Sequence, residues 1–329
     1  MKNRSTEKRI TRGITKAFAE AFKESELYPF YEKYKDELFI GVRNNYLNLY
    51  YNCDSIAKIT YTNGSISCET DKYYIDGKHY KTGKEKRCRV EPIQIIELYE
   101  DIKKHSNAKA TPEKKVQSKL VLLNNGNKES KWFCIDIEYV KQFNNIKEKK
   151  EADFNGRFDI IALSKVKPHR VALIELKYGS GAIGGNSGIY KHVEDFSKFC
   201  DKGFFEGHLK EEMINIIRCQ KELGIYVPFE LPEEANVLKP EFYIITLDNN
   251  IKKEKVSSPK QTMAGYLFRN HRWGCKKLST KYCVEANFGD ITKKDNKFHA
   301  TFLFSSATLD ELQITDIIDG GYCERIVPE

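Results

Sequence analysis

The sequence predicts an α/β protein whose central part has the element order α-β-β-β-α-β, with an extra helix after the third strand. Helical patterns precede and follow three consecutive strand-like segments, and a further strand-like segment closes the series. Strand-like runs with tight-turn signals come before this series, and more strand-like runs follow it. We therefore expect an N-terminal α+β accessory domain over 1–105, the core over 106–255, and a strand-rich C-terminal extension over 256–329.

The composition limits the class of protein. A chain of 329 residues with 40% apolar residues can build the cores of about two domains. Lys and Arg exceed Asp and Glu by 55 to 47, a net charge of +8, which favours a polyanionic partner but equally fits a protein with solvated lysines. No segment reaches the ~20 apolar residues of a membrane span. We expect a cytoplasmic protein without a membrane partner, whose nine cysteines form no C-x-x-C pair and stay reduced.

Two patterns define the accessory domain. Over residues 6–24, apolar side chains recur four apart and predict a packed helix whose buried stripe contains Ile10, Ile14, Phe18 and Phe22. Over residues 38–90, short strand-like runs are separated by two tight-turn signals, Asn63-Gly64 and Asp76-Gly77. An antiparallel sheet is therefore expected after the helix, with a loop or domain boundary near 80–110.

The core elements follow in order. Thr111 and Pro112 predict a helix start, because Thr caps the first turn and Pro fits its first position, and the helix should end after Leu122. Three strands come next, at 132–140, 156–163 and 171–179. The series ends with helices over 187–200 and 208–224 and a strand over 241–249.

Asp159, Glu175 and Lys177 are the candidate catalytic residues. Asp159 lies in the second strand of the core, and a turn separates it from Glu175 and Lys177 in the third. Side chains alternate along a strand, so Glu175 and Lys177 share a face, and a hairpin brings Asp159 level with them. Two adjacent buried carboxylates need a cation, and one or two carboxylates commonly hold Mg²⁺. We expect Asp159 and Glu175 to bind Mg²⁺, for which Mn²⁺ would substitute, and Lys177 to place positive charge beside the reacting phosphate.

This constellation resembles the PD-(D/E)XK nuclease superfamily, which has the restriction-endonuclease-like fold. The resemblance covers about residues 110–250 and rests on Asp159, the Glu175-Leu176-Lys177 motif and the order of elements. It implies that Asp159 is the metal-binding Asp of the motif, Glu175 its second acid and Lys177 its lysine. Phe158 stands where the name of the motif has Pro.

Further candidates surround this motif. The resemblance implies an additional acid or amide on the first core helix, where the chain offers Glu113 or Gln117. Asp136 and Glu138 share a face of the preceding strand and could supplement the metal site, although an exposed strand face explains them equally well.

A glycine-rich loop follows the third strand. Gly179, Gly181 and Gly184 form G-x-G-x-x-G, a sequence typical of dinucleotide-binding sites. Such a site needs an acid about 20 residues on, at the end of a second parallel strand, but the candidate, Asp195, lies in a predicted helix. The dinucleotide interpretation therefore fails on context, and the loop is expected to lead into a helix N-terminus that can attract phosphate.

Two groups of residues are candidates for nucleic-acid binding. Ser187, Lys191 and His192 lie at the start of the helix after the glycine loop. Arg269 and Arg272 lie in a segment that mixes basic and aromatic residues, a combination that can contact phosphates and stack on bases. A solvated surface explains both groups about equally well.

The sequence as a whole predicts a Mg²⁺-dependent endonuclease that hydrolyses phosphodiester bonds, with DNA favoured over RNA as its partner. The resemblance implies a role in defence against foreign DNA or in DNA processing, as a homodimer or within a larger defence complex. The alternative is a catalytically degenerate nucleic-acid-binding or adaptor protein on the same fold. The simplest explanation of Lys177 alone is a surface ion pair with Glu175 or Asp159.

Overall fold

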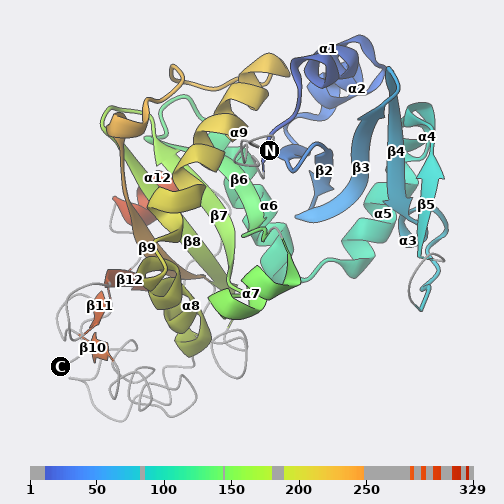
Figure 1. Cartoon of the computed structure of the whole chain (residues 1–329). Coiled ribbons are helices and arrows are strands. Elements are labelled where there is room, and N and C mark those ends of the chain that lie inside the picture. The colour runs from blue at the N-terminus through green and yellow to red at the C-terminus, as the bar shows by residue number, and fades with distance from the viewer. Residues whose placement is uncertain are drawn as a thin grey trace.

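The computed structural model describes a mixed α/β fold with two β-sheets (Figure 1). One sheet has five antiparallel strands, and the other has eight strands of mixed direction. The described residues are 12–81, 86–143, 145–179, 189–247, 282–284, 290–293, 299–304, 313–319 and 324–325. Among the helices of these residues, none has the length and apolar character that a membrane crossing requires.

The five-stranded sheet forms the N-terminal part of the molecule. Its strands, in spatial order, are β1 (Phe39–Val42), β2 (Leu47–Tyr51), β3 (Asp54–Thr62), β4 (Ser65–Asp71) and β5 (Arg87–Val90). Asn63 and Gly64, with φ of 52° and 80°, form the turn between β3 and β4. Both angles are positive, as the favoured two-residue hairpin turns require, and the expected hairpin is confirmed.

The helices of this part differ from expectation at two places. They are α1 (Lys16–Glu24), α2 (Leu27–Tyr34), α3 (Lys72–Asp76), α4 (Pro92–Glu97) and α5 (Tyr99–Lys109). The described helix begins at Lys16, because Gly13 forms a β-bridge with Asn44 and Thr15 caps the helix by accepting from Phe18 N, and residues 6–11 of the expected helix lie outside the described part. Asp76-Gly77 ends α3, with Gly77 at φ 71°, and is not a hairpin turn.

The core elements follow the expected order, with additions. They are α6 (Pro112–Gly126), β6 (Trp132–Val140), α7 (Ile146–Ala152), β7 (Arg157–Ser164), β8 (His169–Tyr178), α8 (Ile189–Asp201), the π-helix η2 (Phe205–Leu209), α9 (Lys210–Glu222), the 3₁₀ turn η3 (Glu234–Asn236) and β9 (Val237–Leu247). The Thr111 hydroxyl accepts from Lys114 N, which confirms the predicted cap of α6. The helix continues to Gly126, past its expected end, because the Asn124 amide is buried and donates to Trp132 O (2.9 Å).

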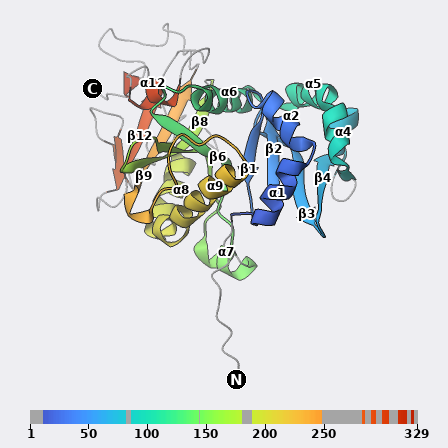
Figure 2. The ribbon, with the colours of Figure 1, turned by 90° about the horizontal axis from the view of Figure 1, so that it is seen from above.

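The second sheet has helices on both faces. Its order is β10 (Tyr282–Val284), β11 (Asp290–Lys293), β12 (His299–Phe304), β9, β8, β7, β6, with β13 (Glu324–Arg325) paired to β12. The strand β12 runs parallel to β9, so the C-terminal strands extend the core sheet. One face packs against α8 and α9, and the other against α6 and α12 (Ile314–Ile318), as Figure 2 shows from above.

The helix α9 belongs to two apolar cores at once. Met213 and Ile217 pack on the core sheet, whereas Ile216, Cys219 and Leu223 join the cluster formed by α1, α2 and the five-stranded sheet. These two sets lie on different sides of a helix with 3.6 residues per turn. The accessory elements and the core are therefore packed together through buried side chains.

A buried ionic cluster joins the same two parts. Asp136 of β6 is fully buried, and its two oxygens accept from Arg12 Nη1 (2.9 Å) and Arg43 Nη1 (2.7 Å). Arg12 also lies over the Tyr139 ring, 4.4 Å from its centroid. Asp136 thus pairs with two buried guanidinium groups and does not supplement a metal site.

Replacing Arg12 by Met is expected to lower the free energy of unfolding by about 2 kcal/mol, the usual contribution of a hydrogen bond to a charged group. Asp136 keeps Arg43 as its partner, so the loss stays below that of an unpaired buried charge. Urea unfolding measures this loss, with Lys16→Met as the exposed control, since Lys16 forms a long surface pair with Glu20 (3.8 Å). Equal stability of the two variants would contradict this role of Arg12.

Candidate active site

The register of β7 and β8 brings Asp159 and Glu175 together. Ile160 pairs with Ile174 in this antiparallel ladder, so the next step along it sets Asp159 opposite Glu175. Leu176 N donates to Asp159 Oδ2 at 2.9 Å, which holds that carboxylate against β8. Lys177, two residues beyond Glu175, lies on the same face of β8. The hairpin therefore assembles the three side chains that the sequence singled out.

These three side chains are buried. Asp159, Glu175 and Lys177 expose 5%, 3% and 5% of their surface. Lys177 Nζ donates to Glu175 Oε1 at 2.6 Å, so the ion pair considered for Lys177 does form. It is not a surface pair, however, and a buried pair of this kind carries a desolvation cost that exposed pairs avoid.

His192 completes the surroundings of Glu175. Its Nε2 lies 2.9 Å from Glu175 Oε1, the same oxygen that accepts from Lys177. Burial alone would raise the pKa of Glu175, but the hydrogen bonds from His192 and Lys177 outweigh it and hold this pKa below its usual value. Glu175 is therefore held as a carboxylate.

Asp159 has the opposite electrostatic character. Burial, reinforced by the nearby charges of Glu175 and Glu138, raises its pKa well above the usual range, and the hydrogen bond from Leu176 offsets this only in part. Glu138 lies between Ile137 and Tyr139, which pair with Ile160 and Phe158, so it stands beside Asp159 on β6. Among the described residues, the positive charge of Lys177 also offsets this rise only in part.

Arg157, at the start of β7, forms an ion pair with Glu138, the acid next to Asp159. Its Nη1 lies 2.9 Å from Glu138 Oε2, and half of its side chain is exposed. Arg157 therefore neutralises the charge of Glu138. The sequence offered Glu138 as a possible supplement to the site, and the structure places it next to Asp159.

The first turns of α6 support the cluster from another side. The Gln117 amide donates to Asp159 O at 2.7 Å, which fixes the backbone of β7. Glu113 Oε2 accepts from Tyr178 N at 3.3 Å, just after Lys177. Burial raises the pKa of Glu113, and Lys177 opposes that shift. Both α6 residues named from the sequence therefore contact the strands that carry the candidate site.

The candidates for nucleic-acid binding are placed only in part. The Lys191 ammonium pairs with Asp195 Oδ1 at 2.7 Å on α8, and 44% of the Lys191 side chain is exposed, whereas His192 contacts Glu175. Ser187, Arg269 and Arg272 lie outside the described residues. The sequence predicted His192 to bind nucleic acid, and the structure places it against Glu175 instead. No local sequence pattern indicates this contact between α8 and β8.

The glycine loop begins where β8 ends. Gly179 has φ 76° and donates its N–H to Leu247 O at 3.0 Å, while residues 180–188 lie outside the described part. Asp195 lies within α8, and β9 starts only at Val237. An acid at the end of a second parallel strand is thus missing at the required position among the described residues, as expected from the sequence.

The donor set at Asp159 and Glu175 suits a hard divalent cation. Mg²⁺ takes oxygen ligands, often one or two carboxylates, and fills its other positions with water and phosphate. A cation near both acids would favour the charged form of Asp159, whose pKa is raised by burial and by the charges of Glu175 and Glu138. Within the described residues, no three His, Cys, Asp or Glu side chains are grouped closely enough to form a metal cage by themselves.

No protein-family model, curated protein or solved structure matches this chain.

Proposed function

We propose that the protein is a metal-dependent nuclease of the PD-(D/E)XK type with a restriction-endonuclease-like core. One observation carries the proposal: Asp159, Glu175 and Lys177 lie buried together on two adjacent antiparallel strands, and burial beside Glu175 and Glu138 raises the pKa of Asp159. Two acids and a lysine are the groups that this chemistry uses, and an ion pair alone does not account for Asp159.

Each residue has a distinct role in this proposal. Asp159 and Glu175 would hold Mg²⁺, or Mn²⁺ in its place, and this ion would supply a nucleophilic water and stabilise charge on the phosphate. Lys177 holds a positive charge against Glu175 and would stabilise negative charge on the reacting phosphate. Gln117 and Glu113 keep the two strands in place through their backbone contacts.

The proposed substrate is DNA in preference to RNA, and the biological setting is defence against foreign DNA or DNA processing. A net charge of +8 favours a polyanionic partner. The proposal includes a cytoplasmic location and assembly as a homodimer or within a larger defence complex.

A catalytically degenerate nucleic-acid-binding or adaptor protein is the second candidate. It is favoured by the contacts of Glu175, whose Oε1 already accepts from Lys177 and lies within hydrogen-bonding distance of His192. A carboxylate satisfied in this way can be purely structural. Cleavage separates the two candidates, because both are expected to bind nucleic acid.

The test is a cleavage assay with the full chain on plasmid, linear duplex DNA, single-stranded DNA and RNA. Each substrate is incubated with Mg²⁺, Mn²⁺ or EDTA. The nuclease proposal expects cleavage with either ion and none with EDTA. Binding to the same substrates without cleavage under any of these conditions would favour the adaptor.

Lys191→Ala is expected to weaken nucleic-acid binding uniformly across sequences and to lower the salt dependence of binding by about one unit of slope, if its exposed ammonium neutralises one phosphate. Filter binding over a range of salt concentrations measures the slope. Lys202→Ala is the control, because Lys202 is an exposed lysine just after α8. An unchanged slope for Lys191→Ala would leave Lys191 as the ion-pair partner of Asp195 only.

A further inference from the structure

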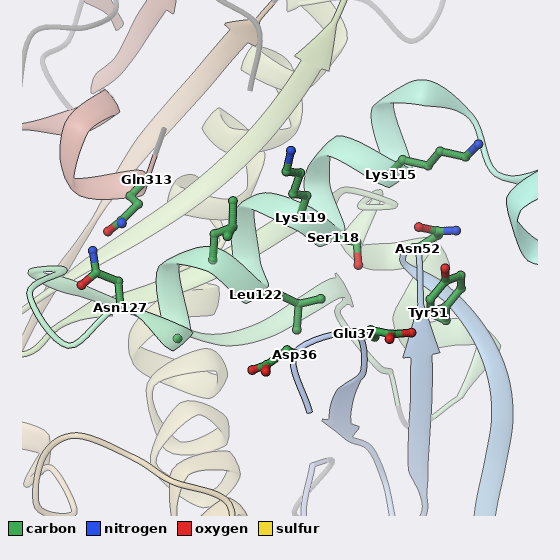
Figure 3. Close-up of a pocket in the computed structure, with 12 residues that line it drawn as sticks. Asp36, Glu37, Tyr51, Asn52, Lys115, Ser118, Lys119, Leu122, Asn127 and Gln313 are labelled. Atoms are coloured by element: carbon green, nitrogen blue, oxygen red, sulfur yellow. The ribbon is translucent and has the colours of Figure 1, made fainter. Parts of the chain in front are cut away.

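A pocket of about 490 Å³ lies against α6 (Figure 3), and no residue of the candidate active site lines it. Three parts of the chain line it: α6 itself, the turn between α2 and β1, and the end of β2. Gln313, just before α12, closes one end beside Asn127. Its volume lies within the range of small-molecule sites.

The two long edges of the pocket have opposite charge. Lys115 and Lys119 stand one helical turn apart along one side of α6, and Asp36 and Glu37 lie on the other side (Figure 3). Lys115 and Asp36 are exposed, and neither forms an ion pair with another described residue. Glu37 Oε2 accepts from the Tyr99 hydroxyl at 3.2 Å and lies 3.4 Å from Lys103 Nζ, and these two contacts fix it in position.

Apolar surface lies between the charged edges. Leu122 projects from α6 into this space, and the half-buried ring of Tyr51 stands at the end of β2 (Figure 3). The Tyr51 hydroxyl accepts from Asn107 Nδ2 of α5 at 3.3 Å, and this hydrogen bond fixes the orientation of the ring. An aromatic ring and a leucine together can contact the flat face of a heterocycle.

We propose that this pocket binds a nucleoside 5′-phosphate. The phosphate would lie between Lys115 and Lys119, because two lysines at i and i+4 can both reach one dianion. The base would contact Tyr51 and Leu122. Ribose hydroxyls or a base amino group would donate to Asp36 or Glu37.

Simpler ligands fit the charge pattern less well. An inorganic anion would be attracted by the two lysines and repelled by the two carboxylates. A small cation would be attracted by the carboxylates and repelled by the lysines. A ligand with an anionic group at one end and hydrogen-bond donors at the other satisfies both edges. This inference is independent of the proposed nuclease activity, because binding is measured without cleavage.

The experiment is calorimetric titration of the full chain, in EDTA, with AMP, GMP, CMP and UMP, and with adenosine and inorganic phosphate as comparisons. At least one mononucleotide is expected to bind. Lys115→Ala and Lys119→Ala should each weaken its binding about 10-fold, the loss of one charge-assisted contact. Asp36→Ala should weaken mononucleotide binding but leave any binding of inorganic phosphate unchanged. Lys104→Ala, an exposed lysine of α5 outside the pocket, should bind as the wild type does.

A competing 5′-phosphorylated trinucleotide distinguishes the source of the ligand. Displacement of the bound mononucleotide would show that the pocket takes the end of a strand, and no displacement would show that it takes a free nucleotide. The proposal is overturned if none of the four mononucleotides binds, if inorganic phosphate binds equally tightly, or if both lysine variants of α6 keep full affinity. Circular dichroism confirms that each variant is folded.

Discussion

Asp159→Asn is expected to abolish divalent-ion-dependent cleavage while the protein stays folded. Asn keeps an oxygen that can accept from Leu176 N, so the contact between β7 and β8 survives. The charge needed to hold the cation is lost, and with it the stabilisation of the reacting phosphate. Cleavage of linear duplex DNA with Mn²⁺, measured beside circular dichroism, reports both properties.

The same variant is expected to raise the stability of the metal-free protein at neutral pH. Folding raises the pKa of the Asp159 carboxyl above the value of about 3.9 that it has in the unfolded chain. The free energy of unfolding therefore falls as the pH rises above about 3.9, and it continues to fall until the pH reaches the pKa of the folded state. Asn carries no such charge, so Asp159→Asn should be more stable than the wild type above a pH of about 3.9 and equally stable in acid. Asp153→Asn is the matched control, because Asp153 is exposed and pairs with Lys198 at the surface. Full cleavage by a folded Asp159→Asn protein would contradict the assignment.

Lys177→Met is expected to reduce the cleavage rate by at least ~100-fold while divalent-ion binding persists or tightens. Met keeps the apolar stem of the side chain, and both carboxylates remain to hold the ion. The variant loses the ammonium that would stabilise the negative charge developing on the reacting phosphate, so the cleavage rate falls. Mn²⁺ titration and cleavage are measured on one preparation.

Lys198→Met provides the comparison for Lys177. Lys198 forms an ion pair with Asp153 at 2.7 Å on the exposed side of α8, and such pairs contribute about 0 to 1 kcal/mol. Its cleavage rate should equal that of the wild type. Normal cleavage by Lys177→Met as well would reduce Lys177 to a structural partner of Glu175.

The positions of Asp159, Glu175 and Lys177 relative to one another were predictable because they depend on local rules. The two-residue period of a strand places Glu175 and Lys177 on one face, and a short hairpin sets Asp159 opposite Glu175. The cap of α6 at Thr111 is local in the same sense, since it depends on one hydroxyl and the next turn of helix.

The surroundings of these residues depend on contacts between distant segments, which no local pattern encodes. His192 reaches Glu175 from another element, and Arg12 reaches Asp136 across 124 positions of sequence. Glu138 is turned by a positive φ of 52°, and the register shifts between Cys134 and Asp136, so strict alternation fails along β6. Asp136 and Glu138 therefore have different surroundings, although the pattern gave them one face.

The helix α6 shows a related limit of local reasoning. Two asparagines and a glycine after Leu122 favour the end of a helix. Asn124 and Asn125 instead donate to backbone carbonyls of β6, at Trp132 and Cys134, both at 2.9 Å. Tertiary hydrogen bonds thus override the local preference and extend the helix by one turn.

The central claim is that Asp159 and Glu175 hold a divalent cation on which phosphodiester cleavage depends. The most direct measurement is a calorimetric Mn²⁺ titration of the wild type and of Asp159→Asn, followed by cleavage of linear duplex DNA with the same two samples. We predict saturable Mn²⁺ binding and cleavage in the wild type, and the loss of both in Asp159→Asn. Mn²⁺ binding that is equal in the two proteins, or cleavage that persists in Asp159→Asn or in EDTA, would contradict the claim.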